Sequence, residues 1–334
     1  MVKYILKRVL LAIGILIGVS IIIYFSVRLM PTDYIDNKYQ PQLLSGQMTQ
    51  ADIDRIKELY GLADSSFGGI LKGYFQWLFK ALFQADLGRS MYYELPVTEV
   101  IFKNMGISFA IAFVALILQF AIAIPLGIKA ATHQYGAVDY TTTVFAMIGI
   151  SLPTFFLAAL LIRVFCQGVG IGLFPAPIEW NTEMMNAGSW AQFVDTVWHL
   201  TLPVLTLVIL SIGGLMRYTR TNTLEVLNAD YIRTARAKGL SEHSVIYKHA
   251  FRNTMIPLVT LLAGTLPGLF SGAMITETVF SISGIGRMAY VALQNSDVTF
   301  VMGYNMFLAI LTVLGTLLSD LMYAVVDPRV KLAK

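Results

Sequence analysis

The stretch VLLAIGILIGVSIIIYFSV, residues 9–27, is nineteen residues long and contains no charged side chain. A helix rises about 1.5 Å per residue, so about 20 apolar residues cross a hydrocarbon core of about 30 Å. The stretch therefore predicts a membrane-spanning helix. Lys3, Lys7 and Arg8 precede it as they would precede a secretory signal, but no small-x-small cleavage site follows, so we expect an uncleaved anchor.

Five further stretches are also long and apolar enough to span a membrane. None of the six alternates apolar and polar residues with a period of two, so we expect helices rather than the strands of a barrel. The predicted spans are residues 9–27, 105–128, 140–162, 200–216, 254–276 and 300–319.

The composition of the whole chain agrees with a membrane location. Of its 334 residues, 56% are apolar or aromatic and 13% are charged, which is about half the charged fraction of a typical soluble protein. This composition excludes a disordered chain and a secreted disulfide scaffold, and it is unsuited to a soluble enzyme. The single cysteine, Cys166, excludes an internal disulfide and every cysteine-based metal site.

The basic residues predict on which side of the membrane each loop lies. With the N-terminus inside, the cytoplasmic segments hold fourteen Lys and Arg residues, whereas the outer loops 166–198 and 277–299 hold only Arg287. Short outer loops rarely keep Lys or Arg. We therefore expect both termini in the cytoplasm, and we interpret the net charge of +4 as a sign of membrane orientation rather than of nucleic-acid binding.

The segment between the first two spans, residues 31–104, predicts a small extracellular subdomain. Thr49 and Asp52 can cap a helix that ends at Gly61. A second helix either packs within this subdomain, which we favour, or lies along the outer membrane surface. Its apolar face consists of Ile70, Leu71, Tyr74, Phe75, Leu78, Phe79, Leu82 and Phe83.

The longest cytoplasmic loop, residues 217–252, either rests on anionic lipid headgroups or docks a cytoplasmic partner. The chain can be helical from Leu224 to Lys238, where Gly239 provides a C-terminal stop. Ser241 can then begin another short helix. One stripe of the first helix would hold Leu224, Leu227, Tyr231, Lys238 and either Thr234 or Ala235.

The predicted spans lack the groups that an ion-driven carrier or an enzyme would need. Four of the six spans contain no ionisable side chain, so there is no ion-coupling site to assign. The chain has no phosphate-binding Gly-x-x-x-x-Gly-Lys loop, no His-Glu-x-x-His motif and no Ser/His/Asp set. We therefore predict a transporter without catalytic residues or a metal site, which obtains its energy from another polypeptide.

The fifth span contains Gly264, Gly268 and Gly272, spaced four residues apart. This doubled Gly-x-x-x-Gly pattern lets another helix approach closely. The pattern indicates close packing and does not identify the partner, which is equally a helix of the same chain, a second subunit or the translocation path.

The cytoplasmic loop carries the most specific motif of the chain. LEVLNADYIRTARAKGL at 224–240, followed by HAFRN at 249–253 and IP at 256–257, resembles the inner-membrane permeases of ATP-binding-cassette (ABC) peptide importers. It is most similar to the first of the two permease subunits in dipeptide and oligopeptide systems. Residues 233–235 are Arg-Thr-Ala where importers of this fold commonly have Glu-Ala-Ala, a departure that the peptide branch shares.

The resemblance extends over nearly the whole chain. Further motifs similar to those of the family are DLGRS at 86–90, ETVF at 277–280, GIGR at 284–287, DPR at 327–329 and MPTD at 30–33. Ser281-Ile-Ser283 stands where Ser-Trp-Pro is more usual, and Thr32 stands where Gly is common. These departures concern the details of the outer loops.

The resemblance implies an all-α integral membrane protein with the six-helix type I ABC importer permease fold, located in the cell membrane of a prokaryote. The implied organisation is a first anchor helix (1–30), an extracellular subdomain (31–104), a core permease domain (105–326) and a cytoplasmic tail (327–334). The core would contain five transmembrane helices and the cytoplasmic coupling loop 217–252.

The resemblance also implies partners. These are a homologous second permease, two ABC ATPases that bind ATP and Mg²⁺, and an extracellular or periplasmic protein that delivers a peptide. This chain would bind no cofactor. Contact with an ATPase would be made by Asp230, Tyr231, Arg233, Thr234, Ala235, Arg236, Ala237, Lys238, Gly239 and Leu240. The alternatives are a nickel-type importer of the same family and an ion-coupled secondary transporter.

Overall fold

The computed structural model of the chain describes residues 2–28, 34–59, 66–168, 170–177 and 188–326. The motifs at 30–33 and 327–329 and the predicted tail therefore lie outside the described residues. The described part of the chain is helical, with two isolated β-bridges and no strand. Its elements are α1 (Val2–Arg28), α2 (Tyr34–Leu44), α3 (Gln50–Leu59), α4 (Phe67–Phe83), α5 (Val97–Thr132), α6 (Ala137–Ser151), α7 (Thr154–Phe165), α9 (Trp190–Leu227), α10 (Asp230–Ala237), α11 (Glu242–Ser244), the π-helix η1 (Val245–Ala250), α12 (Phe251–Ser271), α13 (Met274–Val279), α14 (Ile285–Gln294) and α15 (Val298–Val326).

Several of these helices are long and apolar enough to cross a membrane. Four pass by length and composition, namely Leu10–Arg28 of α1, α5, α9 and Val298–Leu317 of α15, and the pair α6 and α7 makes a fifth if it is one span. The fifth predicted span corresponds to α12, which is 21 residues long. The prediction of an all-α membrane fold is confirmed, and the number of six spans stays a prediction.

The predicted third span, 140–162, is not one straight helix. α6 ends at Ser151 and α7 begins at Thr154, and the two helices are bent by 104°. Leu152 and Pro153 between them have extended backbone angles, because proline lacks an N–H and disfavours helical angles in the residue before it. Hydropathy alone does not detect this break, since Pro153 lies in an uncharged stretch.

The helices α5 and α9 extend well beyond the apolar stretches that predicted them. They are 36 and 38 residues long. At its start, α9 has a capping box in which Ser189 and Gln192 satisfy each other's backbone N–H groups. Hydropathy identifies the part of a helix that lies in hydrocarbon, whereas caps determine where the helix begins and ends.

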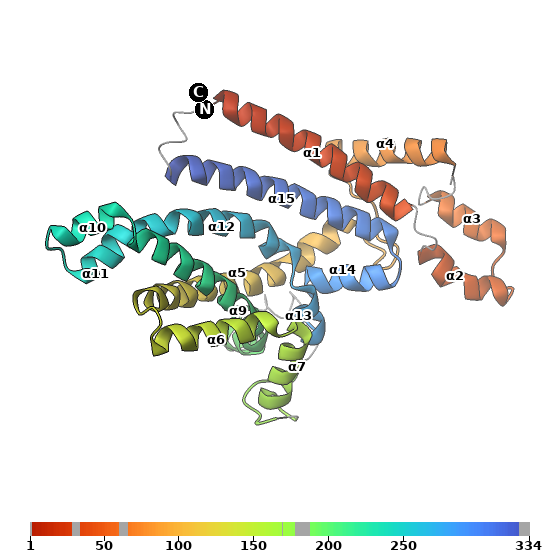
Figure 1. Cartoon of the computed structure of the whole chain (residues 1–334). Helices are drawn as coiled ribbons and strands as arrows, with labels where there is room; N and C mark the ends of the chain where they lie inside the picture. The colour runs from red at the N-terminus through yellow and green to blue at the C-terminus, as the bar shows by residue number, and fades with distance from the viewer. Residues whose placement is uncertain (1, 29–33, 60–65, 169, 178–187, 327–334) are drawn as a thin grey trace.

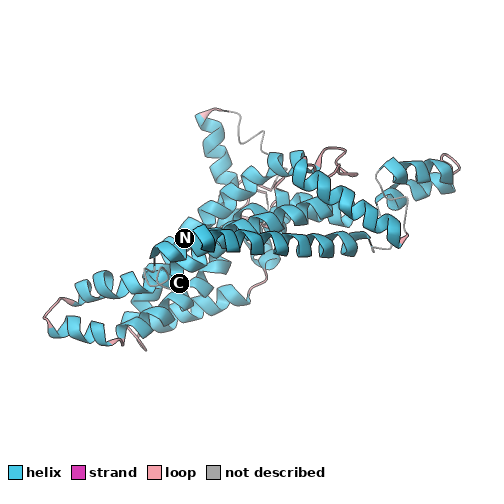
Figure 2. Cartoon of the chain, turned by 90° about the horizontal axis from the view of Figure 1, so that it is seen from above, coloured by secondary structure: helices cyan, strands magenta, loops and turns pink. Residues whose placement is uncertain are grey.

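The long helices run lengthwise beside one another and give the molecule two distinct ends (Figure 1). The start of α1, the end of α15 and the pair α10–α11 lie together at one end, while α2, α3 and α14 lie at the other. Turned by 90°, the molecule is again elongated along the same direction (Figure 2). This arrangement agrees with the predicted orientation, in which α10 and α11 share the cytoplasmic side with both ends of the chain.

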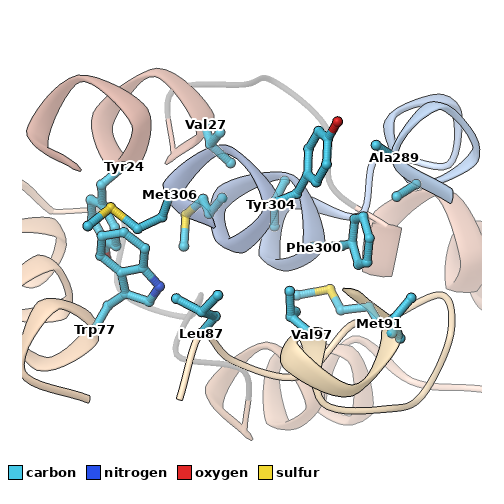
Figure 3. Close-up of a cluster of buried hydrophobic side chains, with 14 of the residues drawn as sticks. Tyr24, Val27, Trp77, Leu87, Met91, Val97, Ala289, Phe300, Tyr304 and Met306 are labelled. Atoms are coloured by element: carbon cyan, nitrogen blue, oxygen red, sulfur yellow. The ribbon is translucent and has the colours of Figure 1, made fainter. Parts of the chain in front are cut away.

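We call the end that holds α2, α3 and α14 the outer end and the end that holds α10 and α11 the inner or cytoplasmic end, after the predicted orientation. The largest hydrophobic cluster among the described residues lies at the outer end and surrounds the first turns of α15 (Figure 3). Phe300 and Val97 are completely buried there, and Tyr24 and Trp77 enter from α1 and α4. The cluster thus joins the first span, the outer segment and the last span into one packed unit.

In the outer segment, a helix forms at each of the two predicted places, and the predicted stop at Gly61 lies outside the described residues. Asp52 accepts hydrogen bonds from the N–H and the hydroxyl of Thr49 at the start of α3. The helix α4 buries Tyr74 of the predicted apolar face together with Trp77, whereas Leu71, Phe75, Phe79, Leu82 and Phe83 of that face stay exposed, so the favoured packing of this face is wrong for most of its residues. The partner of Tyr74 and Trp77 is Tyr24 of α1, with ring centroids 5.5 and 5.8 Å away, so α4 is held by the first span.

Candidate functional site

The cytoplasmic loop folds into two helices where the sequence predicted one. We expected a continuous helix from Leu224 to Lys238, but α9 ends at Leu227 and α10 begins at Asp230. Asn228 caps the end of α9 through its backbone N–H, and its side chain donates to the Leu224 carbonyl. Ala229 has an extended backbone (ψ 148°), so the chain changes direction between the two helices.

The break alters which residues of the loop face inward. The inward face of α10 consists of Ile232 and Ala235, which pack with Val245 and Ala250 into a separate small core. Tyr231 and Lys238, which belonged to the predicted stripe, are exposed, whereas Ala235 of the same stripe is buried. The prediction of one continuous stripe is therefore wrong, because Ala229 changes the rotation of the helix that follows.

Gly239 follows the end of α10 in the way its position predicted. Its φ of +75° is left-handed, a conformation that costs side chains with a Cβ about 1–2 kcal/mol. A Cβ built on Gly239 would meet no atom within 4 Å. The backbone angle, and not a lack of space, therefore demands glycine here. Ser241 then caps α11 by accepting from the Ser244 N–H, as expected.

One ion pair joins the two sides of this turn, and a second lies within α10. Arg236 of α10 binds Glu242 of α11, with Nε 2.8 Å from Oε1. Asp230 and Arg233 are 3.7 Å apart within α10, and both side chains are largely solvated. Exposed pairs contribute only about 0.2–1 kcal/mol each, so they orient the surface more than they stabilise it.

The π-helix η1 connects this element directly to α12. A π-helix is rare, and this one contains His249 and Ala250, the first two residues of the HAFRN motif. Partial burial raises the pKa of the Tyr231 phenol, while the nearby side chain of Asn253, one turn into α12, lowers this pKa by less. The helix α10 is therefore linked to α12 by the backbone of η1, and its Tyr231 side chain lies near α12.

All ten predicted coupling residues lie on α10 or on the turn after it, and only Ala235 is buried. The exposed set includes two large apolar side chains, Tyr231 and Leu240, with 46% and 39% of their surface exposed. The element thus presents a continuous surface of apolar and basic groups on a short rigid support, which is a geometry suited to docking a protein.

The three glycines of α12 divide into two kinds. A Cβ on Gly264 or Gly268 would meet no atom of the described residues within 4 Å. Gly272 lies beyond the end of α12 with φ +76°, where a Cβ would collide with the backbone of Gly286. Gly272 thus lies against the same chain, whereas the partner of Gly264 and Gly268 stays a prediction with its three alternatives.

At the outer end, the DLGRS motif is organised around Asp297, a residue that the sequence analysis did not single out. The completely buried Asp297 carboxylate accepts from the Ser90 hydroxyl and from the N–H groups of Tyr92 and Phe300. Gly88 has φ +97° and lies against Thr299. The signal that could have revealed Asp297 is its position just before the last span, where Asp commonly caps a helix.

A second buried carboxylate, Glu277, organises the ETVF and GIGR motifs. It accepts from the Ser108 hydroxyl at 2.6 Å and from the N–H groups of Ala273 and Arg287 at 3.0 and 2.9 Å. Burial raises the pKa of Glu277 above its ordinary value, although these hydrogen bonds act in the opposite direction. The glycines of GIGR leave room for it, since a Cβ on Gly284 would collide with the carboxylate.

On the cytoplasmic half, Asp139 pairs with Arg220. The carboxylate and the guanidinium form two hydrogen bonds of 2.6 and 2.7 Å, which join the start of α6 to α9. A cavity of about 490 Å³ opens beside this pair and is lined in part by Tyr135, Met147 and Arg217. Within the described ranges, no cluster of three His, Cys, Asp or Glu side chains could hold a metal ion.

Comparisons with known proteins agree with the motif analysis. A family described as "Binding-protein-dependent transport system inner membrane component" matches residues 123–332. The oligopeptide transport system permease protein AppB of Bacillus subtilis is 34% identical over 332 residues, covering 99% of this chain and 100% of the relative. The dipeptide transport system permease protein DppB of Alkalihalophilus pseudofirmus is 32% identical over 344 residues, with 99% and 100% covered.

A solved structure shares the fold. The chain resembles one described as inward facing conformations of the MetNI methionine ABC transporter, with a TM-score of 0.50 and 17% sequence identity. The likeness covers 69% of this chain and 97% of that chain.

Proposed function

Because this chain belongs to the family of binding-protein-dependent transport system inner membrane components, we propose that it is one permease subunit of an ATP-driven importer of di- and oligopeptides. The peptide cargo rests on the names of relatives that match the chain over nearly its full length. In this proposal a binding protein delivers the peptide to the outer end, and a homologous second permease completes the path.

The observation that carries the proposal is the exposed helix α10 on its own small core. Its inward face is satisfied by Ile232 and Ala235, while Tyr231 and Leu240 stay exposed. Exposed aromatic and apolar side chains on a rigid support are typical of protein interfaces. We assign this surface to an ATPase subunit, which would bind ATP and Mg²⁺ itself.

The mechanism follows from how α10 is connected. When an ATPase pair closes, it carries α10 with it, and the movement reaches α12 through the η1 backbone and the neighbouring side chains of Tyr231 and Asn253. The bundle then tilts and opens outward, and ATP hydrolysis reverses the change. This is a two-state element that a distant ligand biases.

Gly264 and Gly268 of α12 would face the second permease or the path between the two permeases. A face without side chains on a spanning helix allows a second helix to approach closely, and none of the described residues of this chain does so. The same helix therefore joins the coupling element to the region through which the peptide passes.

Cross-linking from single cysteines tests the coupling assignment. In a Cys166→Ser background, Tyr231→Cys and Leu240→Cys should each cross-link to an ATPase subunit in membranes that contain the whole complex. Leu44→Cys is the matched control, because Leu44 is a large apolar residue, 82% exposed, on α2 at the opposite end. A cross-link from Leu44→Cys, or none from either α10 position, would contradict the assignment.

The cargo is tested by ATP hydrolysis of the purified complex reconstituted with its binding protein. Di- and oligopeptides should stimulate hydrolysis, and Ni²⁺ should not. Stimulation by Ni²⁺ alone would overturn the peptide assignment and favour the nickel-type alternative, while leaving the coupling assignment intact.

A further inference from the structure

The outer helix α4 has three distinct sides, of which only one is used for packing within the chain. The packed side carries Tyr74 and Trp77. A second side carries exposed polar residues, namely Lys72, Gln76 and Lys80. The third side is exposed and apolar, and consists of Leu71, Phe75, Phe79, Leu82 and Phe83.

The packed side places α4 at the depth of the outer leaflet. The Tyr74 hydroxyl lies 2.9 Å from the hydroxyl of Ser20, a contact that is buried. The candidate span of α1 ends at Arg28, and Ser20 lies eight residues before it, which corresponds to about 12 Å along a helix. Since half of the hydrocarbon core is about 15 Å thick, α4 meets α1 within its outer half.

The contact is close enough to hold α4 at this depth. A Cβ on Gly73 would collide with the Tyr24 hydroxyl, so the α4 backbone lies directly against the Tyr24 side chain of α1. Tyr24 also stacks obliquely on Trp77, and Figure 3 shows both side chains at the same edge of the core around α15. Figure 1 accordingly shows α4 beside the second half of α1.

We propose that the apolar side of α4 is a lipid-contacting surface that inserts into the outer leaflet of the bilayer. Phe75 and Phe79 are 59% and 55% exposed and offer no hydrogen-bonding group. The helix α1, on which α4 packs, also exposes apolar residues, which include Ile17, Ile21 and Ile22. Apolar faces of interfacial helices enter a membrane by about 5–10 Å, a depth compatible with the contact to Ser20.

The composition of α4 favours lipid over a protein partner. Protein interfaces carry about one hydrogen bond per 100–200 Å², whereas the five exposed residues on this side have only apolar side chains. The neighbouring polar side has two lysines and no acidic residue. Lysine side chains can extend from such a helix to the phosphate groups of the headgroups while their stems stay in apolar surroundings.

Spin labels at single cysteines test this surface in the assembled complex, reconstituted in vesicles of phosphatidylethanolamine and phosphatidylglycerol. The measured quantity is the collision rate of each label with oxygen divided by its collision rate with a water-soluble nickel chelate. In a Cys166→Ser background, this ratio should be several-fold higher for labels at Phe75→Cys and Phe79→Cys than for a label at Gln76→Cys. Gln76 is the matched control because it is exposed, adjacent in sequence and on the polar side.

Two results would overturn the proposal. Equal access of the nickel chelate to Phe75→Cys and Gln76→Cys would place this side of α4 in water. Poor access of both oxygen and the chelate to Phe75→Cys and Phe79→Cys would mean that a protein, such as the second permease, covers it. All of these positions are exposed, and the substitutions remove only the ring contacts of Phe75 with Tyr74 and of Phe79 with Phe83. Co-purification of the ATPases verifies that the complex is intact.

Discussion

The two ends of this molecule use their motifs in opposite ways. At the outer end, the motif residues surround two buried carboxylates, Glu277 and Asp297, which are 1% and 0% exposed. At the cytoplasmic end, the motif residues of α10 are exposed, and its only inward side chains are Ile232 and Ala235. The motifs at both ends resemble those of the same family. The outer end is held together by internal hydrogen bonds, whereas the motif residues of α10 are exposed on the surface.

The difference indicates what each motif is for. Buried charges are tolerated only where donors satisfy them, so the outer motifs hold loops, α5 and the start of α15 in a single arrangement. An exposed surface contributes little to the stability of its own chain, so the residues of α10 are better explained by a partner. The comparison predicts large effects on folding at the outer end and effects on coupling at the inner end.

The largest effect is expected from Asp297→Ala. The substitution leaves the Ser90 hydroxyl and the N–H groups of Tyr92 and Phe300 buried without an acceptor, which should cost about 3 kcal/mol or more. Thermal unfolding of the detergent-purified protein measures the loss. Asp230→Ala is the matched control at the inner end, where the carboxylate is solvated, and it should change the unfolding temperature little. Equal losses from both substitutions would remove the contrast between the ends.

The next effect is a pH dependence that belongs to Glu277. Burial raises its pKa in the folded protein, so the native state holds this proton more tightly than the unfolded chain does. The resulting contribution to stability is complete below the unfolded pKa and is lost as the pH rises through the folded pKa. Unfolding temperatures between pH 4 and pH 8, compared with those of Glu277→Gln, should show this loss only in the unsubstituted protein. Parallel curves for the two proteins would contradict it.

A smaller effect on stability, with a large effect on transport, is expected from Gly239→Val. The left-handed backbone at Gly239 makes a β-branched residue unfavourable by about 1–2 kcal/mol, and this cost falls on the exposed turn after α10. Membrane insertion should be unchanged and peptide uptake should be lost. Gly239→Asn is the control, because asparagine tolerates left-handed angles and should keep part of the uptake. Normal uptake by Gly239→Val would exclude this turn from coupling.

The smallest effect on the chain itself is expected from Gly268→Leu. A Cβ there meets no atom within 4 Å, so the unfolding temperature of the isolated chain should not change. If the second permease packs on this face, co-purification of that subunit should decrease. Gly14→Leu is the matched control on α1, where a Cβ also meets no atom. Retention of the second permease together with unchanged peptide uptake by Gly268→Leu would mean that this glycine faces lipid, and retention with lost uptake would place it on the path.

The candidate site was predictable from the sequence in its location but only partly in its geometry. The left-handed turn at Gly239 and the cap at Ser241 follow from local preferences, which act over a few residues. The break at Asn228 and Ala229 did not follow, because neither residue is a strong helix breaker. Packing of Ile232 and Ala235 against Val245 and Ala250 favours the two-helix arrangement, and these contacts join segments that are separate in the sequence.

The membrane character and the apolar stretches were determined by the sequence alone, because transfer into a bilayer depends on composition along the chain, and the sidedness of the basic loops stays a prediction from the same composition. The partners of Glu277 and Asp297, the Asp139–Arg220 pair and the docking of α4 on α1 were decided only by tertiary structure. Each of these contacts joins residues from distant parts of the chain. Neither hydropathy nor helix propensity contains information about such contacts, since both depend on neighbours in sequence and not on neighbours in space.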